Sequence, residues 1–223
     1  MKGAVFFDLD GTLIQGQSQK IMALRLWREG QISGLTFIPI LFWFLLYKLG
    51  VAPNVSWVMS KAYTLLKGQE ASKLNKLLRI IVTEEIESQI FPEALKKIRE
   101  YQQEGYAVGI ISTSIDPLVQ ILVKKFDLSF GRGTKLEQKD GMFTGRIQGK
   151  VLYGQEKVVI IRKLALEQGL DLEKSYAFTD SHSDLPLLKI VGHPMIVNPD
   201  ERLKRKAQLS HWKIYHWFID AHQ

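Results

Sequence analysis

The sequence contains no cysteine among its 223 residues. Disulfide bonds, thiolate catalysis and zinc sites built from cysteine are therefore excluded. A chain without cysteine fits a reducing compartment but does not require one.

No secretory leader is expected, and the sequence shows no low-complexity segment. The chain begins Met1-Lys2-Gly3 and enters the apolar segment 4–7, which is too short for the apolar core of a signal peptide. Hydrophobic residues make up 46% of the chain and charged residues 24%, which excludes a wholly disordered chain. We therefore expect a globular, cytoplasmic protein.

Negative charge is in deficit, because 30 Lys and Arg residues face 23 Asp and Glu residues and leave a formal charge of +7. Such an excess attracts anionic partners: phosphorylated substrates, nucleic acid or anionic lipid headgroups. The clearest basic run consists of Arg202, Lys204, Arg205 and Lys206. We interpret it as the solvated face of a late helix. Since no aromatic side chains alternate with it for base stacking, no nucleic-acid partner is expected.

An apolar run without charge covers residues 35–47, LTFIPILFWFLLY. It is shorter than the roughly 20 residues that a membrane-spanning helix needs, Pro39 would kink it, and Lys48 ends it. Three interpretations stay open: a cap helix packed on the active site or in a dimer, a membrane-surface element that admits a lipid phosphate, and a short span. We favour the first of these. The oligomeric state is left open.

Apolar strands and helical patterns alternate through most of the chain. Short runs rich in β-formers predict strands at 3–9, 107–112, 175–179 and 193–197, and helical patterns lie at 92–104, 116–126, 155–169 and 184–191. Buried strands that alternate with helices imply a parallel sheet covered on both faces. The predicted fold class is α/β, a Rossmann-like sheet.

Two stretches interrupt this alternation. Residues 134–147 predict a hairpin that turns at Asp140-Gly141. Residues 16–90 contain helical patterns and no convincing strand, so we expect a small helical cap inserted after the first strand. The predicted catalytic core is then 1–15 together with 91–223.

The first strand ends in an acidic pair within Asp8-Leu9-Asp10-Gly11-Thr12. Ligands bind beyond the carboxyl ends of parallel strands, and side chains two residues apart point to the same side of a strand. Two carboxylates that converge there repel each other unless a cation or a proton lies between them, and oxygen ligands favour Mg²⁺. Gly11 permits a sharp turn, and Thr12 can donate a hydrogen bond.

Three later segments carry further candidates, each of which also has an ordinary explanation. Ser112 and Thr113 could cradle a phosphate or simply cap a helix. Lys157 could hold a phosphate as a point charge or lie on the surface. Asp180 ends the third strand, and Asp184 lies four residues further on, where it could be a helix N-terminal charge. His182 between them is interpreted as a loop residue.

In this order, DLDGT, IIS, Lys157 and DSHSD resemble the motifs of the haloacid dehalogenase superfamily of phosphotransferases. Residues 91–199 look closest to its phosphoserine-phosphatase-like subfamily, subfamily IB. The resemblance covers the whole chain except most of 16–90, where that subfamily also carries a small helical cap. The apolar run resembles, more loosely, the insertion of bacterial phosphatidylglycerophosphate phosphatases.

The resemblance implies a Mg²⁺-dependent phosphatase with an aspartyl-phosphate intermediate. Asp8 would be the nucleophile and Asp10 the general acid and base. Ser112, Thr113 and Lys157 would bind the phosphoryl group. Mg²⁺ would be held by Asp8, Asp180 and the main-chain carbonyl of Asp10, with Asp184 and Thr12 supporting the site.

The chain departs from the subfamily at Thr113 and Ser114, where two glycines are usual, and at Ser183, where asparagine is common. Phosphoserine as the substrate is thereby in doubt, and a lipid headgroup phosphate remains an alternative to a small phosphorylated metabolite. Two other functions stay open: a phosphotransferase or mutase of the same family, and a non-catalytic module that binds membrane surfaces.

Overall fold

The computed structural model describes residues 2–32, 38, 42 and 55–219. Six strands form one parallel sheet in the order β3-β2-β1-β6-β7-β8, and two more form a separate antiparallel pair. The sheet strands are β1 (Ala4–Phe7), β2 (Ala107–Ile115), β3 (Phe130–Thr134), β6 (Tyr176–Thr179), β7 (His193–Val197) and β8 (Lys213–Tyr215). The predicted α/β fold class is confirmed.

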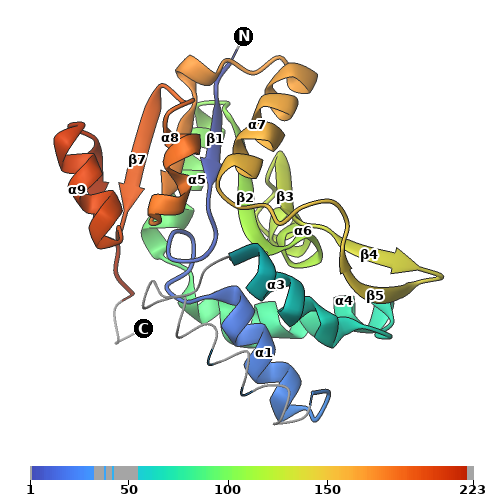
Figure 1. Ribbon diagram of the computed structural model, residues 1–223. Coiled ribbons are helices and arrows are strands. Elements are labelled where there is room, and N and C mark those ends of the chain that lie inside the picture. Colours follow the sequence, from blue (N-terminus) through green and yellow to red (C-terminus); the bar gives the residue numbers. More distant parts are fainter. Residues whose placement is uncertain (1, 33–37, 39–41, 43–54, 220–223) are drawn as a thin grey trace.

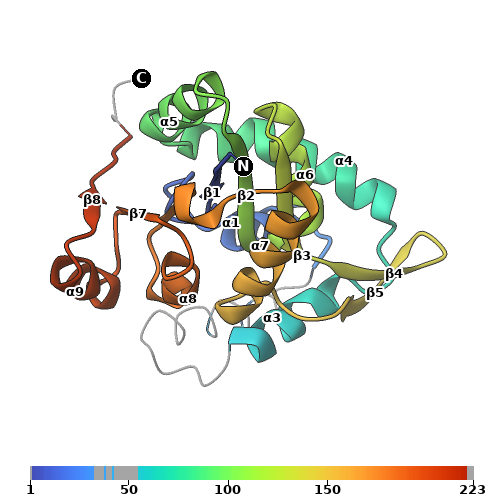
Figure 2. The ribbon, with the colours of Figure 1, turned by 90° about the horizontal axis from the view of Figure 1, so that it is seen from above.

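Helices cover both faces of this sheet, as Figure 2 shows from above. The helices outside the insertion are α5 (Pro92–Gln103), α6 (Asp116–Lys125), α7 (Gln155–Gln168), α8 (Leu185–Leu188) and α9 (Glu201–Leu209). Alternation along β1 explains the two layers. Val5 and Phe7 join the hydrophobic cluster that contains α5 and α6 residues, whereas Ala4 and Phe6 join the cluster of α7, α8 and α9.

The predicted hairpin is present as β4 (Leu136–Lys139) and β5 (Met142–Ile147). Its turn falls at Asp140 and Gly141, both of which have positive φ. The predicted helix over 184–191 is shorter than expected, because it begins only after a 3₁₀ turn (His182–Asp184) and ends at Leu188. Strands β3 and β8 were not predicted from the sequence.

Residues 16–90 contribute the helices α1 (Ser18–Arg28), α3 (Val55–Tyr63) and α4 (Ala71–Ile81). Shorter turns complete the described helical segments: 3₁₀ turns at Thr64–Leu66, Glu87–Gln89 and Leu172–Lys174, and a π turn at Val82–Ile86. Figure 1 shows α1, α3 and α4 beyond the carboxyl ends of the sheet strands. The division into core and cap stays a prediction. The two regions share one hydrophobic cluster, which includes Phe7 of the sheet together with Leu78 and Ile81 of α4.

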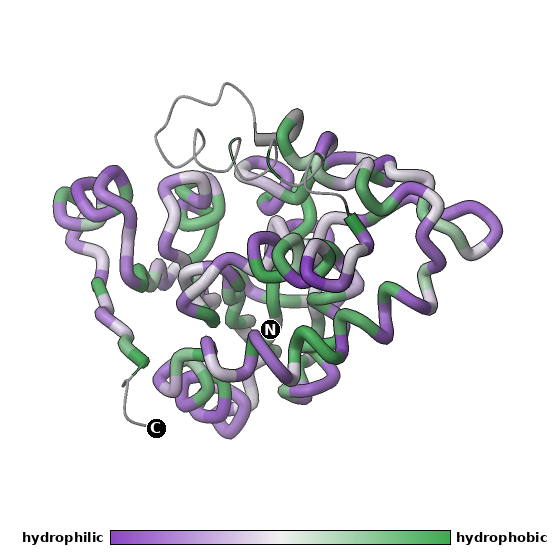
Figure 3. Tube along the Cα trace, turned by 90° about the horizontal axis from the view of Figure 1, so that it is seen from below, coloured by the Kyte–Doolittle hydropathy of each residue, from purple (hydrophilic) through white to green (hydrophobic). Residues whose placement is uncertain are grey.

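The distribution of hydropathy agrees with this packing. Figure 3 shows hydrophobic residues along the central strands and both colours alternating along α4. In α9, Arg202 and Arg205 are exposed while Leu203 is fully buried, so the basic run does lie on an outer helix face. Most of the apolar run 35–47 lies outside the described residues. None of the described helices combines the length and apolar character needed to cross a bilayer.

The packing of α4 predicts unequal effects at two adjacent isoleucines. Ile81→Ala removes a fully buried side chain and should lower the free energy of unfolding by about 2–5 kcal/mol, as large-to-small core substitutions do. Ile80→Ala alters a side chain that is 42% exposed and should cost less than about 1 kcal/mol. Urea unfolding of both variants measures the difference. Equal losses would contradict the packing of α4 against α1 and α6.

Candidate active site

The first strand delivers its acidic pair through a tight turn. Asp8 continues the strand pairing, because its N–H donates to the carbonyl of Phe178 in β6 at 2.9 Å. The chain then folds back on Leu9, whose carbonyl accepts from the N–H groups of Thr12, Leu13 and Ile14. Asp8 and Asp10 are thereby held at the carboxyl edge of the sheet, where the sequence predicted them.

Gly11 is required where this turn meets Asp180. Its φ is +76°, and a Cβ atom built on it would lie 2.2 Å from the Oδ2 atom of Asp180. The hydroxyl of Thr12 lies 3.5 Å from Asp180 Oδ1. The absence of a side chain at Gly11 therefore lets the carboxylate that ends β6 come close to the loop that follows β1.

A buried lysine joins two of the acids. The Nζ atom of Lys157, in the first turn of α7, lies 3.1 Å from Asp8 Oδ1 and 2.7 Å from Asp184 Oδ2. Thr179 donates to the same Asp184 oxygen at 2.8 Å. Lys157 is 1% exposed and Asp184 is fully buried. The lysine is thus neither a surface residue nor free to turn, and it holds Asp8 in one orientation.

The electrostatics reflect an excess of buried acid. Burial raises the pKa of Asp8 to about 7, although Lys157 opposes the change. Burial also raises the pKa of Asp10, and it raises that of Asp180 well above its usual range, with the charge of Asp8 adding to the effect. For Lys157, burial favours the neutral form, but the charges of Asp184 and Asp8 prevail and raise its pKa.

The strand end at Ser112–Ser114 bulges out of the sheet, because the register between β2 and β3 shifts between Ile111 and Ile115. The hydroxyl of Ser112 accepts from the N–H of Ser114 at 3.1 Å, which leaves its own proton free to donate. The hydroxyl of Thr113 donates to the carbonyl of Leu152 at 3.0 Å. Thr113 can therefore offer an anion only its main-chain N–H, and its role stays a prediction.

Asp10 is held by the helical insertion. Its Oδ1 accepts from the main-chain N–H of Ser18 at 2.6 Å, and its Oδ2 lies 3.1 Å from the Ser18 hydroxyl. That hydroxyl also lies 2.8 Å from the hydroxyl of Ser114. Burial of the carboxylate is therefore offset by two hydrogen bonds from a single residue.

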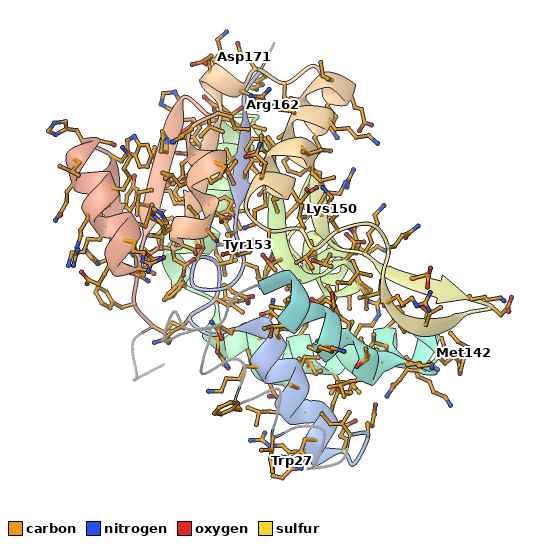
Figure 4. All side chains as sticks on the ribbon, viewed as in Figure 1. Trp27, Met142, Lys150, Tyr153, Arg162 and Asp171 are labelled. Carbon is orange, nitrogen blue, oxygen red and sulfur yellow. The ribbon has the colours of Figure 1, made fainter. Side chains whose placement is uncertain are left out.

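A cavity of about 110 Å³ brings these groups together. It is lined by Asp8, Asp10, Gln17, Gln19, Met59, Ser112, Thr113, Tyr153, Lys157, Asp180, Ser181 and Ser183. Figure 4 shows Tyr153 near the start of α7, facing the helices of the insertion. Every residue predicted as catalytic, phosphate-binding or metal-binding lines this cavity. Asp184 and Thr12 lie behind it as fully buried supports.

Several lining residues were not predicted from the sequence. Gln17, Gln19 and Met59 come from the insertion, whose contact with the core cannot be recognised from helical periodicity. Ser181 and Ser183 lie within the predicted acidic segment, so their position could have been anticipated. Tyr153 precedes Lys157 by one helical turn, which is the only signal the sequence offers for it.

The residues present fit a Mg²⁺ ion. Four carboxylates face one ammonium group, so the ionised site has excess negative charge that a divalent cation would neutralise. The Oδ1 atom of Asp184 is buried without a hydrogen-bond partner. No cluster of three His, Cys, Asp or Glu side chains suited to a metal occurs among the described residues. The predicted ligand set stays a prediction, because it uses only the Asp8 and Asp180 side chains and one main-chain carbonyl, which that search does not cover.

The fold and the site define a class: an α/β enzyme with an acidic site at the carboxyl ends of parallel strands. Comparison with known families agrees, because the profile of the haloacid dehalogenase-like hydrolases matches residues 5–189. The chain therefore belongs to the haloacid dehalogenase-like hydrolase family. The resemblance inferred from its motifs is confirmed.

Individual relatives point to one branch of the family. A phosphoserine phosphatase of Mycobacterium tuberculosis is 30% identical over 219 residues, which cover 96% of this chain and 70% of that protein. A phosphoserine phosphatase of Methanocaldococcus jannaschii is 27% identical over 93% of this chain and 91% of its own length. The predicted phosphoserine-phosphatase-like subfamily and the phosphatase class of enzyme are confirmed.

Solved structures support the same fold. A Bordetella pertussis protein of unknown function superposes with a TM-score of 0.87 at 24% identity, covering 96% of this chain and 98% of that one. A phospho-aspartyl intermediate analogue of phosphoserine phosphatase superposes with a TM-score of 0.71 at 25% identity, covering 96% and 92%.

The close approach at Gly11 predicts a specific loss of Mg²⁺ affinity. In Gly11→Ala the new Cβ would displace the Asp180 carboxylate, so Mg²⁺ should bind about 10-fold more weakly or worse, as when the support of a metal ligand is lost. Gly68→Ala is the matched control, because Gly68 also has positive φ (+77°) but no atom would lie within 4 Å of its Cβ. Titration calorimetry gives both affinities, and equal values would contradict the role assigned to Gly11.

Proposed function

We propose that this chain is a Mg²⁺-dependent phosphomonoester hydrolase that works through an aspartyl-phosphate on Asp8. The observation that carries the proposal is the contact of Lys157 with both Asp8 and Asp184 in a buried site. A lysine held in this way orients the Asp8 carboxylate and supplies positive charge where a phosphoryl group would arrive. Phosphoryl transfer depends mainly on such positioning and charge neutralisation.

In the first step, a carboxylate oxygen of Asp8 attacks phosphorus and the bond from phosphorus to the leaving oxygen breaks. Asp10, protonated at this stage, gives its proton to that oxygen, so the product leaves as a neutral alcohol. Its raised pKa supports this role, because a buried carboxyl keeps its proton more readily. The hydroxyl of Ser112 and the ammonium of Lys157 would bind the oxygens of the phosphoryl group.

In the second step, water attacks the phosphorus of the aspartyl-phosphate and the bond to Asp8 breaks. Asp10, now ionised, takes a proton from the water, which restores both carboxyl groups and releases inorganic phosphate. A phosphotransferase or mutase would differ only in having an alcohol in place of water. Bound Mg²⁺, held by Asp8, Asp180 and the Asp10 carbonyl, would neutralise charge on the phosphoryl group.

The substrate is either a small phosphorylated metabolite or a lipid headgroup phosphate. Among the described residues that line the cavity, Lys157 is the sole cation, and Asp8 and Asp184 already engage it. Gln17, Gln19, Met59 and Tyr153 are uncharged. Phosphoserine carries a carboxylate and an ammonium beside its phosphate, so this lining favours a leaving alcohol without those charges.

Contact with a membrane surface through residues 35–47 remains part of the proposal for a lipid substrate. Of these residues only Ile38 and Phe42 are described, and they are 64% and 56% exposed. Two exposed apolar side chains four positions apart in the sequence are compatible with an apolar contact.

The test is Mg²⁺-dependent release of phosphate from p-nitrophenyl phosphate. Asp8→Asn should abolish turnover, because an amide cannot attack phosphorus, and removal of Mg²⁺ should stop the wild-type reaction. Asp171→Asn is the control, since Asp171 lies at the opposite end of the sheet, where its N–H meets the carbonyl of Lys2. Turnover retained in Asp8→Asn would refute the proposed nucleophile.

The same assay with a panel of substrates addresses the leaving group. The panel contains phosphoserine, sugar phosphates, nucleotides and phosphatidylglycerol phosphate in detergent. A preference for phosphoserine would contradict the argument from the uncharged lining, and a strong preference for the lipid would select the headgroup alternative.

A further inference from the structure

The first residue of α1 is joined to the acid that serves the leaving group. Ser18 is fully buried, and its main-chain N–H and its hydroxyl contact the two different oxygens of Asp10, at 2.6 Å and 3.1 Å. Such a two-point contact fixes the plane of the carboxyl group as well as its position.

At the start of α1, the N–H groups of Lys20 and Ile21 donate to the carbonyl of Gln17, whereas the N–H of Ser18 donates to Asp10. The residue before the helix, Gln17, makes no side-chain cap, and the first turn of α1 contains no acidic residue. The first N–H groups of a helix lack partners within the helix and favour a negative group. Asp10, eight residues earlier in the chain, therefore acts as the cap of this helix.

We propose that Ser18 is the positioning residue for the general acid, and that its two contacts fix the orientation of the Asp10 carboxyl group. This inference rests on the proposed function. The Oδ1 atom is engaged by the main-chain N–H of Ser18 and the Oδ2 atom by its hydroxyl, so the carboxyl group cannot turn without losing a contact.

A chain of hydroxyl groups extends this arrangement to the phosphate side of the cavity. The Ser18 hydroxyl has one proton, which can go to Asp10 Oδ2 or to the hydroxyl of Ser114, 2.8 Å away. The N–H of Ser114 in turn donates to the Ser112 hydroxyl. Ser18 thus couples the acid to the group that would bind the phosphoryl oxygen, and the insertion to the core.

Removal of the Ser18 hydroxyl should lower kcat/KM most for substrates whose leaving oxygen depends most on protonation. General acid catalysis is typically worth about 100- to 10,000-fold, and loss of positioning removes part of that factor. In Ser18→Ala, kcat/KM for phenyl phosphate should fall about 10-fold or more, and for p-nitrophenyl phosphate less than about 3-fold, because nitrophenolate leaves with little protonation. The plot of log kcat/KM against leaving-group pKa should become steeper.

The matched control is Ser175→Ala. Ser175 is also fully buried and hydrogen-bonded to the strand that carries the site, but at its other end, where its hydroxyl accepts from the N–H of Ala4 at 2.9 Å. A general loss of stability would lower kcat/KM for all aryl phosphates equally, so this variant should leave the slope unchanged.

Ser114→Ala provides a second variant if Ser18→Ala does not fold. It should steepen the slope less, because Ser18 can still donate to Asp10. Slopes that stay parallel to wild type in the folded variants would overturn the inference, even when all substrates are turned over. A wild-type chain without phosphatase activity would instead refute the proposed function.

Discussion

The buried contact of Lys157 with Asp8 and Asp184 is the interaction on which the site depends. Removing an ammonium group and two carboxylates from water is costly, and only close pairing compensates for it. The distances of 3.1 Å and 2.7 Å provide that pairing, and Thr179 gives Asp184 a further hydrogen bond. The three charges do not cancel, and the remaining negative charge is what makes the cavity suitable for a divalent cation with a phosphoryl group.

The parallel sheet explains why these groups meet. Asp8 and Asp180 follow the adjacent strands β1 and β6, and Ser112 lies near the carboxyl end of β2, the other neighbour of β1. All three strands end at the same edge of the sheet. Lys157 is added from the first turn of α7. The insertion then covers this edge, and Ser18 at its first helix contacts Asp10. Residues that lie far apart in the sequence therefore surround one cavity, although each needs only a local strand end or helix start to be placed.

The sequence predicted four strands of the sheet, but it did not predict the contacts between the insertion and the core. The apolar runs that end at Asp8 and Asp180 are recognisable because buried strands leave continuous hydrophobic stretches. Strand β3 is not, because its sequence FGRGT contains Gly131 and Gly133, where a Cβ would lie 2.3 Å from the side chain of Val123 and 2.7 Å from the backbone of Asp116. These glycines allow β3 to pack closely against α6. They also interrupt the apolar pattern by which a strand is recognised in the sequence. Ser18 was not predicted either. Its contact with Asp10 joins the insertion to the core, and the periodicity of a helix does not reveal such a contact.

The central claim is that Asp8 becomes covalently phosphorylated during turnover, and direct detection of the phosphoenzyme tests it most closely. The chain would be mixed with p-nitrophenyl phosphate and Mg²⁺, quenched in acid within the steady state, digested and examined by peptide mass spectrometry. The account predicts one phosphoryl group on the peptide that contains Asp8, labile to hydroxylamine as an acyl phosphate is. A phosphoryl group on another residue, or active turnover with no modification of that peptide, would contradict it.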